Sequence, residues 1–277
     1  EAGVLALPTC ARTELALQAL ARGLHVLLEK PAAMNAGEVR QLLRARGELV
    51  AACASSRFRC LPSAEAATAF LATGALGEIR VLRCRALRPA GPPPGTPPPL
   101  WRLSRQLNGG GIMANWGCYD LDYLLGLTGW RLRPRAVLGR TWTIPAHLGG
   151  HVPPGSDGET HVVAQVLCEG GESLLLERAE YASADCAGSW EIVGARGSLR
   201  LWMPPARHKR VTFTEASAGA GLRETGIWEG HEEDWAMHRG VLEDFALAVR
   251  GRRRPRTGLE EALVVQAVTD AIYASAE

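Results

Sequence analysis

Short apolar runs and amphipathic stretches alternate over the first part of the chain. The apolar runs lie at residues 4–7, 24–28 and 50–55. Runs of this length are typical of buried parallel strands. Helices are predicted between them, at residues 14–22 and 35–48. Gly23 suits the C-cap of the first helix, and Asn35 with Glu38 resembles a capping box for the second. This alternation predicts a parallel sheet covered by helices, or half of a doubly wound domain.

Strands dominate the middle of the chain. Further elements are predicted as helices at 64–74, 111–126, 232–250 and 258–274, and as a strand at 78–87. Residues 131–213 are strand-rich, and Glu169-Gly170-Gly171-Glu172 joins two alternating runs as a hairpin. Residues 89–99 contain seven prolines and predict a surface loop. The second part of the chain is therefore expected to be an α+β domain.

Composition narrows the class of protein. The 277 residues carry a formal net charge of +2, and 47% are hydrophobic and 22% charged. These values are typical of a globular protein and exclude disordered and collagen-like chains. No apolar run reaches the ~18 residues that a membrane-spanning helix requires, so we expect no membrane association. The small net charge gives no reason to expect nucleic acid as a partner.

The cysteines argue against a secreted or zinc-stabilised fold. There are seven, an odd number, with no C-x-x-C spacing. A disulfide framework is therefore not expected, and a reducing cytoplasm is the simpler location. His147 and His151 are four residues apart, but the glycines between them and the prolines after them indicate a loop. We predict no metal site.

Glu29 and Lys30 form the first candidate site, because they follow a predicted parallel strand. Ligands of open α/β sheets bind beyond the carboxyl ends of the strands. Only two of the 31 basic residues, Lys30 and Lys209, are lysines. In a chain that uses arginine almost everywhere, a lysine can mark a position that needs a compact ammonium group. An ordinary ion pair at the strand end is the structural alternative.

The second candidate lies after Gly109-Gly110-Gly111. On a regular α-helix Asn115, Tyr119 and Asp122 would share one face, at i, i+4 and i+7. Three polar groups on a face flanked by apolar residues need partners, which are either buried hydrogen bonds or a ligand. Trp101 and Trp116 are interpreted as packing residues, with the lining of a sugar-sized pocket as the alternative.

Several motifs along the chain resemble one known family. They are Ala6-Leu7-Pro8-Thr9, His25-Val26-Leu27-Leu28-Glu29-Lys30-Pro31, Arg57-Phe58, Gly74-x-Leu76-Gly77, Trp101-Arg102, Gly109-Gly110-Gly111, and the tail from Thr257-Gly258-Leu259 to Ala271-Ile272-Tyr273. In this order they resemble the glucose–fructose oxidoreductase/inositol dehydrogenase (Gfo/Idh/MocA) family, over nearly the whole chain.

The resemblance implies an α/β fold in two parts. Residues 1–58 would be the remaining C-terminal half of a dinucleotide-binding Rossmann domain, a doubly wound parallel sheet whose first half is missing. Residues 59–277 would be an α+β domain with a large, mostly antiparallel open sheet for substrate binding and oligomerisation. The implied activity is hydride transfer between NAD or NADP and a secondary hydroxyl of a sugar, cyclitol or related compound, by a cytoplasmic homo-oligomer, either a dimer or a tetramer.

The resemblance and the chemistry of the side chains together suggest roles for individual residues. Lys30 and Tyr119 would be catalytic, with Tyr119 exchanging the hydroxyl proton. An unperturbed tyrosine has a pKa near 10, and the Lys30 ammonium would favour its phenolate. The residues expected to bind substrate are Asn115, Arg102 and Asp122. Those expected to bind the cofactor are Pro8, Thr9, Glu29, Lys30 and Pro31.

The chain departs from the family pattern at several positions. Asn115 and Tyr119 replace the aspartate and histidine of many members, although some branches have the tyrosine. Arg12 stands where a histidine is common. The phosphate-binding G-x-G-x-x-G motif is absent, and the chain opens with Glu1-Ala2-Gly3 directly before a strand. We therefore expect a chain that begins near the fourth strand of the full fold.

The missing motif leaves alternatives to a dehydrogenase. The first is a family member that has lost redox function and acts as a non-redox lyase or isomerase, or as a binding scaffold. The second is a sugar-binding regulatory subunit. An upstream glycine-rich strand–turn–helix in the native gene would favour the dehydrogenase.

Overall fold

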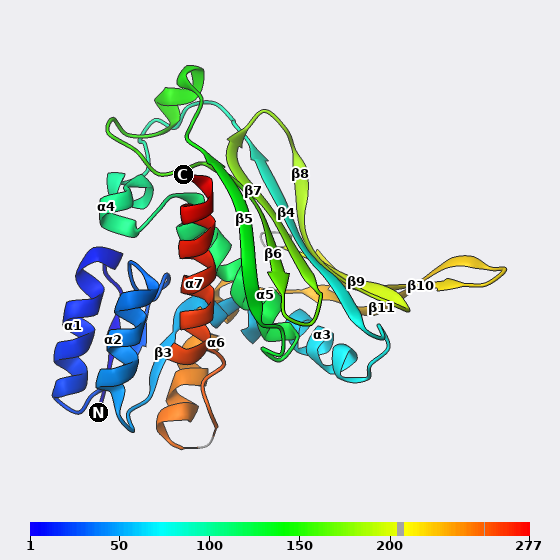
Figure 1. The fold of residues 1–277 in the computed structure, drawn as a ribbon, viewed down its shortest axis with the longest axis horizontal. Helices are drawn as coiled ribbons and strands as arrows, with labels where there is room; N and C mark the ends of the chain where they lie inside the picture. The colour runs from blue at the N-terminus through cyan, green and yellow to red at the C-terminus, as the bar shows by residue number, and fades with distance from the viewer. Residues whose placement is uncertain (204–207, 252) are drawn as a thin grey trace.

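The computed structural model describes residues 1–203, 208–251 and 253–277, which form two β-sheets with flanking helices (Figure 1). The first sheet contains three parallel strands, β1 (Ala2–Leu5), β2 (His25–Leu28) and β3 (Ala51–Cys53). Helices α1 (Thr9–Ala21) and α2 (Ala36–Arg46) connect them. The N-cap predicted at Asn35 is confirmed, since its Oδ1 accepts the Glu38 N–H at 3.0 Å.

The second sheet is large, open and mostly antiparallel, as predicted. Its eight strands run in the order β11-β10-β9-β8-β4-β7-β6-β5, and β4 and β7 pair in parallel. The strands are β4 (Ile79–Pro89), β5 (Pro134–Trp142), β6 (His161–Cys168), β7 (Ser173–Ala182), β8 (Cys186–Gly194), β9 (Gly197–Trp202), β10 (His208–Ser217) and β11 (Gly221–His231). The predicted hairpin is the antiparallel β6–β7 pair.

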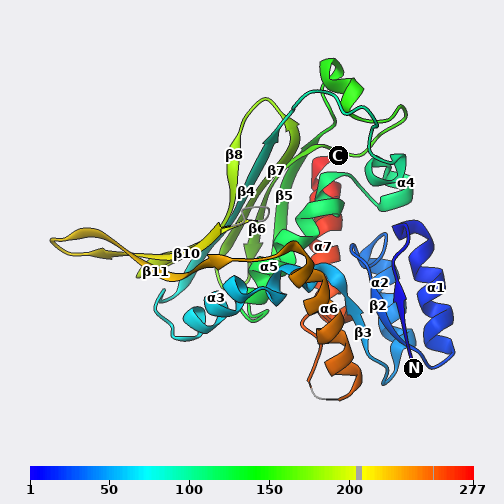
Figure 2. The same ribbon diagram turned by 180° about the vertical axis from the view of Figure 1, so that it is seen from behind.

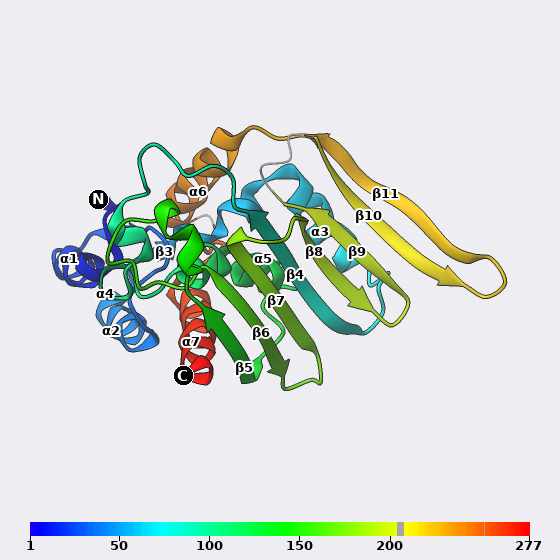
Figure 3. The same cartoon turned by 90° about the horizontal axis from the view of Figure 1, so that it is seen from above.

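Helices cover one face of this second sheet. The remaining helices are η1 (Ala54–Cys60), α3 (Pro62–Ala72), η2 (Leu100–Leu103), α4 (Arg105–Asn108), the π-helix η3 (Met113–Gly117), α5 (Cys118–Leu127), η4 (Ala146–His151), α6 (Asp234–Val249) and α7 (Leu259–Ala276). Figure 3 shows α3 and α5 behind the strands. Leu121 and Leu124 of α5 belong to the same buried core as Leu82, Leu176 and Ile192 of the sheet.

The end of the second sheet differs from the sequence-based expectation. Strand β11 was not predicted, yet it pairs with β10 from His208 opposite His231 to Ser217 opposite Gly221. The two strands project as a long hairpin beyond the rest of the sheet (Figure 2). Most residues of β11 are exposed on both faces, so its sequence lacks the alternation of apolar and polar residues by which a half-buried strand is recognised.

The C-terminal helix joins the two sheets. Leu259 and Ala262 of α7 pack in the core of the first sheet, whereas Val265 and Ile272 pack in the core of the second. The domain boundary at residue 58, which falls within η1, remains a prediction. None of the helices in the described part of the chain is long and apolar enough to cross a membrane.

Candidate active site

A cavity of about 450 Å³ brings the two candidate segments together. Lys30, which follows β2, lines it beside Asn115 of η3 and Tyr119 of α5. Arg102 of η2 lines it as well. Four of the residues predicted as catalytic or substrate-binding therefore share one cavity, although up to 89 residues separate them in the sequence.

Asn115 holds the ammonium group of Lys30. Lys30 Nζ donates to the backbone oxygen of Asn115 at 2.8 Å and to its Oδ1 at 3.2 Å. Burial lowers the pKa of Lys30 below its ordinary value of 10.5; Glu29 opposes this shift, and the guanidinium groups of Arg57 and Arg102 add to it. The neutral amine, which can accept a proton, is therefore more accessible than in an exposed lysine.

Tyr119 lies beneath Lys30 in an aromatic setting. Lys30 Nζ lies 5.0 Å from the centroid of its ring, and the Phe58 and Trp116 rings lie 4.9 and 6.0 Å away. Burial raises the pKa of Tyr119 above its ordinary value of 10. The expectation that Lys30 would favour a phenolate is therefore wrong in this structure, because the loss of hydration disfavours the phenolate more than the neighbouring cations stabilise it.

Asp122 does not face the cavity, which corrects its prediction as a substrate-binding residue. Its side chain is fully buried and accepts hydrogen bonds from Ser55 Oγ at 2.6 Å, Arg59 Nε at 2.7 Å and Thr257 Oγ1 at 2.6 Å. The π-helical turn at Met113–Gly117 is wider than an α-helical turn, so the i, i+4, i+7 geometry does not extend from Asn115 to Asp122. Asp122 is a structural residue.

Arg12 fixes the segments that follow β1 and β2. It is buried, and its guanidinium donates to the backbone oxygens of Leu7 at 2.6 Å, Glu29 at 2.8 Å and Pro31. One arginine thus connects the carboxyl ends of the two strands and holds the backbone on both sides of Lys30. In the sequence, Arg12 stands out only as a departure from the family pattern.

The residues predicted to bind the cofactor lie around the same strand ends. Pro8 precedes α1, and Thr9 Oγ1 donates to Asn108 Oδ1 at 3.0 Å. Glu29 pairs with Arg57 at 2.6 Å, which brings Arg57 to the cavity. No side chain caps the N-terminus of α1. The carboxyl edge of parallel strands is where α/β proteins bind nucleotides, so these residues fit the nicotinamide end of NAD(P) beside Lys30.

A buried glutamate holds the glycine loop that precedes Asn115. Glu159 accepts the N–H groups of Gly111 and Met113 and the Tyr273 hydroxyl, each at 2.8 Å. A Cβ at Gly111 would lie 2.0 Å from the Glu159 backbone oxygen. Glycine is therefore required here by close packing of backbone, and the packing sets where η3 begins.

Several residues that line the cavity were not predicted from the sequence. Arg57 and Phe58 were predicted only as motif residues, and Arg88, Asp234, Met237 and His238 were not predicted at all. Arg88 lies near the end of β4, and the other three lie on the first turns of α6. Nothing in their local pattern separates them from ordinary exposed helix and strand residues, so the sequence held no signal for them. Trp101 and Trp116 do line the cavity.

Comparison with known proteins places the chain in a family. Residues 1–54 match the model of the oxidoreductase family with an NAD-binding Rossmann fold, and residues 64–200 match the GFO/IDH/MocA C-terminal domain. The chain is 30% identical to dTDP-3,4-didehydro-2,6-dideoxy-alpha-D-glucose 3-reductase of Streptomyces violaceoruber, over 90% of this chain and 67% of that protein. It is 34% identical to D-glucoside 3-dehydrogenase of Escherichia coli K12, over 95% and 74%.

Solved structures show the same fold. A levoglucosan dehydrogenase in complex with NADH and levoglucosan superposes with a TM-score of 0.79 at 23% identity, covering 99% of this chain and 77% of that one. An oxidoreductase domain protein from Kribbella flavida gives a TM-score of 0.81 at 23% identity, with the same coverage. With the two family matches and the relatives at 30% and 34% identity, these findings show that the chain belongs to the GFO/IDH/MocA family of NAD-binding oxidoreductases.

Proposed function

We propose that this chain is an NAD(P)-dependent oxidoreductase that moves a hydride between the cofactor and a secondary hydroxyl of a sugar or related compound. Its relatives include a sugar reductase and a glucoside dehydrogenase, and a structural neighbour binds NADH and levoglucosan. The observation that carries the proposal is Lys30, whose ammonium group is held by Asn115 inside a cavity that Trp101 and Trp116 also line.

Lys30 moves the proton in this account. When bound, NAD(P) supplies the nicotinamide ring that accepts or returns the hydride. During oxidation the neutral Lys30 amine accepts the proton of the substrate hydroxyl, and during reduction the ammonium returns it to the new hydroxyl oxygen. Burial supports this role because it lowers the pKa of Lys30. Asn115 orients Nζ through its two accepting oxygens.

Tyr119 and Arg102 position the substrate. Because burial raises the pKa of Tyr119, its hydroxyl stays protonated and donates a hydrogen bond to the reacting oxygen. Arg102, which lines the same cavity, binds groups elsewhere on the substrate. Holding the alcohol next to the cofactor in one geometry supplies much of the rate acceleration.

Replacement of Lys30 tests the proposal. Lys30→Met keeps the length of the side chain and removes the amine, and it should lower turnover of sugars with NAD(P) by roughly 100- to 10,000-fold. Arg40→Ala, which removes an exposed cation from α2, is the matched control and should retain turnover. The melting temperature of each variant shows whether the fold survives. A folded Lys30→Met protein with normal turnover would refute the role of Lys30.

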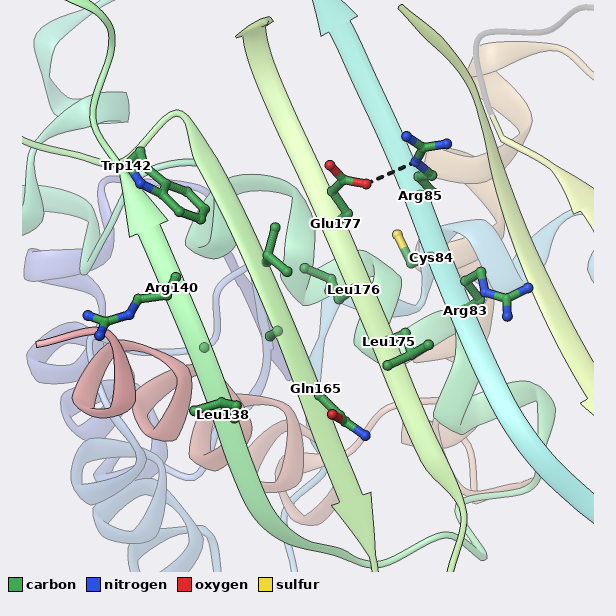
Figure 4. A pocket seen from close by; sticks show the side chains of 13 residues that line it. Arg83, Cys84, Arg85, Leu138, Arg140, Trp142, Gln165, Leu175, Leu176 and Glu177 are labelled. Carbon is green, nitrogen blue, oxygen red and sulfur yellow. Dashed lines mark hydrogen bonds and ion pairs between the residues drawn. The ribbon is translucent and has the colours of Figure 1, made fainter. Parts of the chain in front are cut away.

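We also propose that the chain forms a homo-oligomer through the open face of the second sheet. Figure 4 shows a groove on this face, where Leu138 and Trp142 of β5 lie on the same side as Glu177 and Arg85. Leu138 is 69% exposed and Trp142 51% exposed. Exposed apolar side chains of this size, beside the Arg85–Glu177 ion pair, suit a two-fold contact with a second copy of the chain. Light scattering at micromolar concentration should detect a dimer or tetramer for the wild type, and Leu138→Asp should shift it to monomer. A monomeric wild type would refute this proposal.

The proposed location is the cytoplasm. Cys53, Cys84, Cys118 and Cys168 are buried as thiols within the cores of the described structure, which is the state that a reducing compartment maintains.

A further inference from the structure

The charge of the cavity exceeds what the proposed chemistry needs. Four cationic side chains line it, namely Lys30, Arg57, Arg88 and Arg102, and Asp234 is its one carboxylate among the described residues. Hydride transfer to or from a neutral sugar requires one proton-transferring group and hydrogen-bonding partners. Several guanidinium groups in one small-molecule site are instead typical of recognition of carboxylate or phosphate.

Two of these cations are already engaged within the protein. Arg57 forms an ion pair with Glu29 at 2.6 Å. Lys30 donates to the two oxygens of Asn115, which are uncharged acceptors. These contacts fix the positions of both side chains next to Tyr119. The presence of Lys30 and Arg57 in the cavity therefore does not require a charged ligand.

Arg88 and Arg102 differ from Lys30 and Arg57 in their partners. Among the described residues no carboxylate forms an ion pair with either guanidinium. The guanidinium carbon of Arg88 lies 5.1 Å from the centroid of the Trp116 ring, which orders the side chain beside the cavity. Arg102 is partly buried and close enough to Lys30 to lower its pKa. The guanidinium N–H groups of both arginines are therefore able to donate hydrogen bonds to a ligand.

Arg88 and Arg102 come from other elements of the fold than the residues expected to bind the cofactor. Arg88 and Arg102 are carried by β4 and η2, whereas the residues around the expected nicotinamide position follow β1 and β2. Trp101 and Trp116 line the cavity with them. The origin of the two arginines in other elements favours their contact with the substrate rather than with the cofactor.

We propose that the substrate is an acidic sugar, whose carboxylate or phosphate is bound by Arg88 and Arg102 while its reacting hydroxyl lies at Lys30. This inference rests on the proposed function and narrows it from sugars in general to those that carry an oxyanion. A carboxylate and a phosphate offer the same paired acceptor oxygens to arginine, so the two sources are separated by the choice of probe.

Calorimetric titration tests this without requiring turnover. The probes are D-glucuronate, its uncharged analogue D-glucuronamide, glucose 6-phosphate and dTDP-glucose. At least one anionic probe should bind tenfold or more tightly than D-glucuronamide, and raising the salt concentration should reduce the difference. Preference for glucuronate over both phosphates identifies a carboxylate, and the reverse preference identifies a phosphate. Equal binding of charged and uncharged probes would overturn the inference.

Substitution of the arginines locates the site. Arg88→Ala and Arg102→Ala should each weaken binding of the preferred anion by about tenfold to a hundredfold, the range for hydrogen bonds to charged groups, and should weaken binding of D-glucuronamide much less. The control Arg40→Ala should change neither. The inference would be overturned if the double variant, with both Arg88→Ala and Arg102→Ala, still bound the anion more tightly than D-glucuronamide. It would also be overturned if the variants lost binding of NADH and kept binding of the anion.

Turnover separates this inference from the proposed function. Turnover of neutral and acidic sugars with equal kcat/KM supports the proposed function and refutes the inference. Binding of the anion through Arg88 and Arg102 without hydride transfer from any sugar refutes the proposed function and supports this binding site.

Discussion

Asp122→Asn distinguishes a structural aspartate from a substrate-binding one. In the structure the Asp122 carboxylate is fully buried and accepts hydrogen bonds from Ser55, Arg59 and Thr257. Asparagine has nearly the same shape, but it leaves the Arg59 guanidinium without its counter-charge and turns an amide N–H₂ towards a donor. Removing one partner of a buried ion pair costs about 3–5 kcal/mol.

That cost should be visible as a change in stability. For a protein of this size 1 kcal/mol corresponds to roughly 2–4 °C in melting temperature, so Asp122→Asn should melt roughly 6–20 °C lower. Asp185→Asn makes the same chemical change at an exposed position and should melt like the wild type. Below their melting temperatures both variants should keep the wild-type KM for sugar. An Asp122→Asn protein with normal melting and a raised KM would restore the substrate-binding interpretation and refute the structural one.

Two further predictions concern groups that burial perturbs. Tyr119→Phe should lower turnover by about tenfold, the value of one hydrogen bond, and a loss as large as that of Lys30→Met would make the tyrosine the proton carrier. Burial raises the pKa of Glu159 in the folded state above 4.5, its value in the unfolded chain. The folded state therefore binds this proton more tightly than the unfolded state. The resulting contribution to the free energy of unfolding is lost as the pH rises from about 4.5 through the raised pKa. Urea unfolding from pH 4 to 7 should show this fall for the wild type, whereas Glu159→Gln should lack it; identical slopes would contradict the assignment.

Local patterns were sufficient for most of the fold. The apolar runs of the first sheet and the N-cap at Asn35 appear close to where they were predicted, because buried parallel strands and capped helices depend on neighbouring residues. Strand β11 was missed for the opposite reason, since it is held by main-chain pairing to β10 and buries little of its side-chain surface.

The candidate site was predictable only in part. Lys30 was identified from its place after a parallel strand, Asn115 and Tyr119 from their shared helical face, and Arg102 from a family motif. The structure brings all four to one cavity. Asp122 was misassigned because a π-helical turn interrupts the α-helical spacing. The wider turn changes which residues share a face, and the sequence pattern does not reveal where such a turn occurs.

Partners that are distant in the chain account for the rest. The bond from Arg12 to Pro31, the ion pair of Arg59 with Asp122 and the presence of Arg88 beside Trp116 all depend on how separate elements meet. No local pattern encodes such contacts, because each residue alone would be equally acceptable on a solvated surface.

In the proposed reaction a hydride passes directly between a sugar carbon and NAD(P). Mass spectrometry of the reduced cofactor, after reaction with sugars deuterated at every ring carbon, follows that hydride. We expect each molecule of reduced cofactor to gain one deuterium from the substrate. Conversion of the sugar with release of its deuterium to water, and no labelled cofactor, would refute direct hydride transfer and favour a non-redox lyase or isomerase.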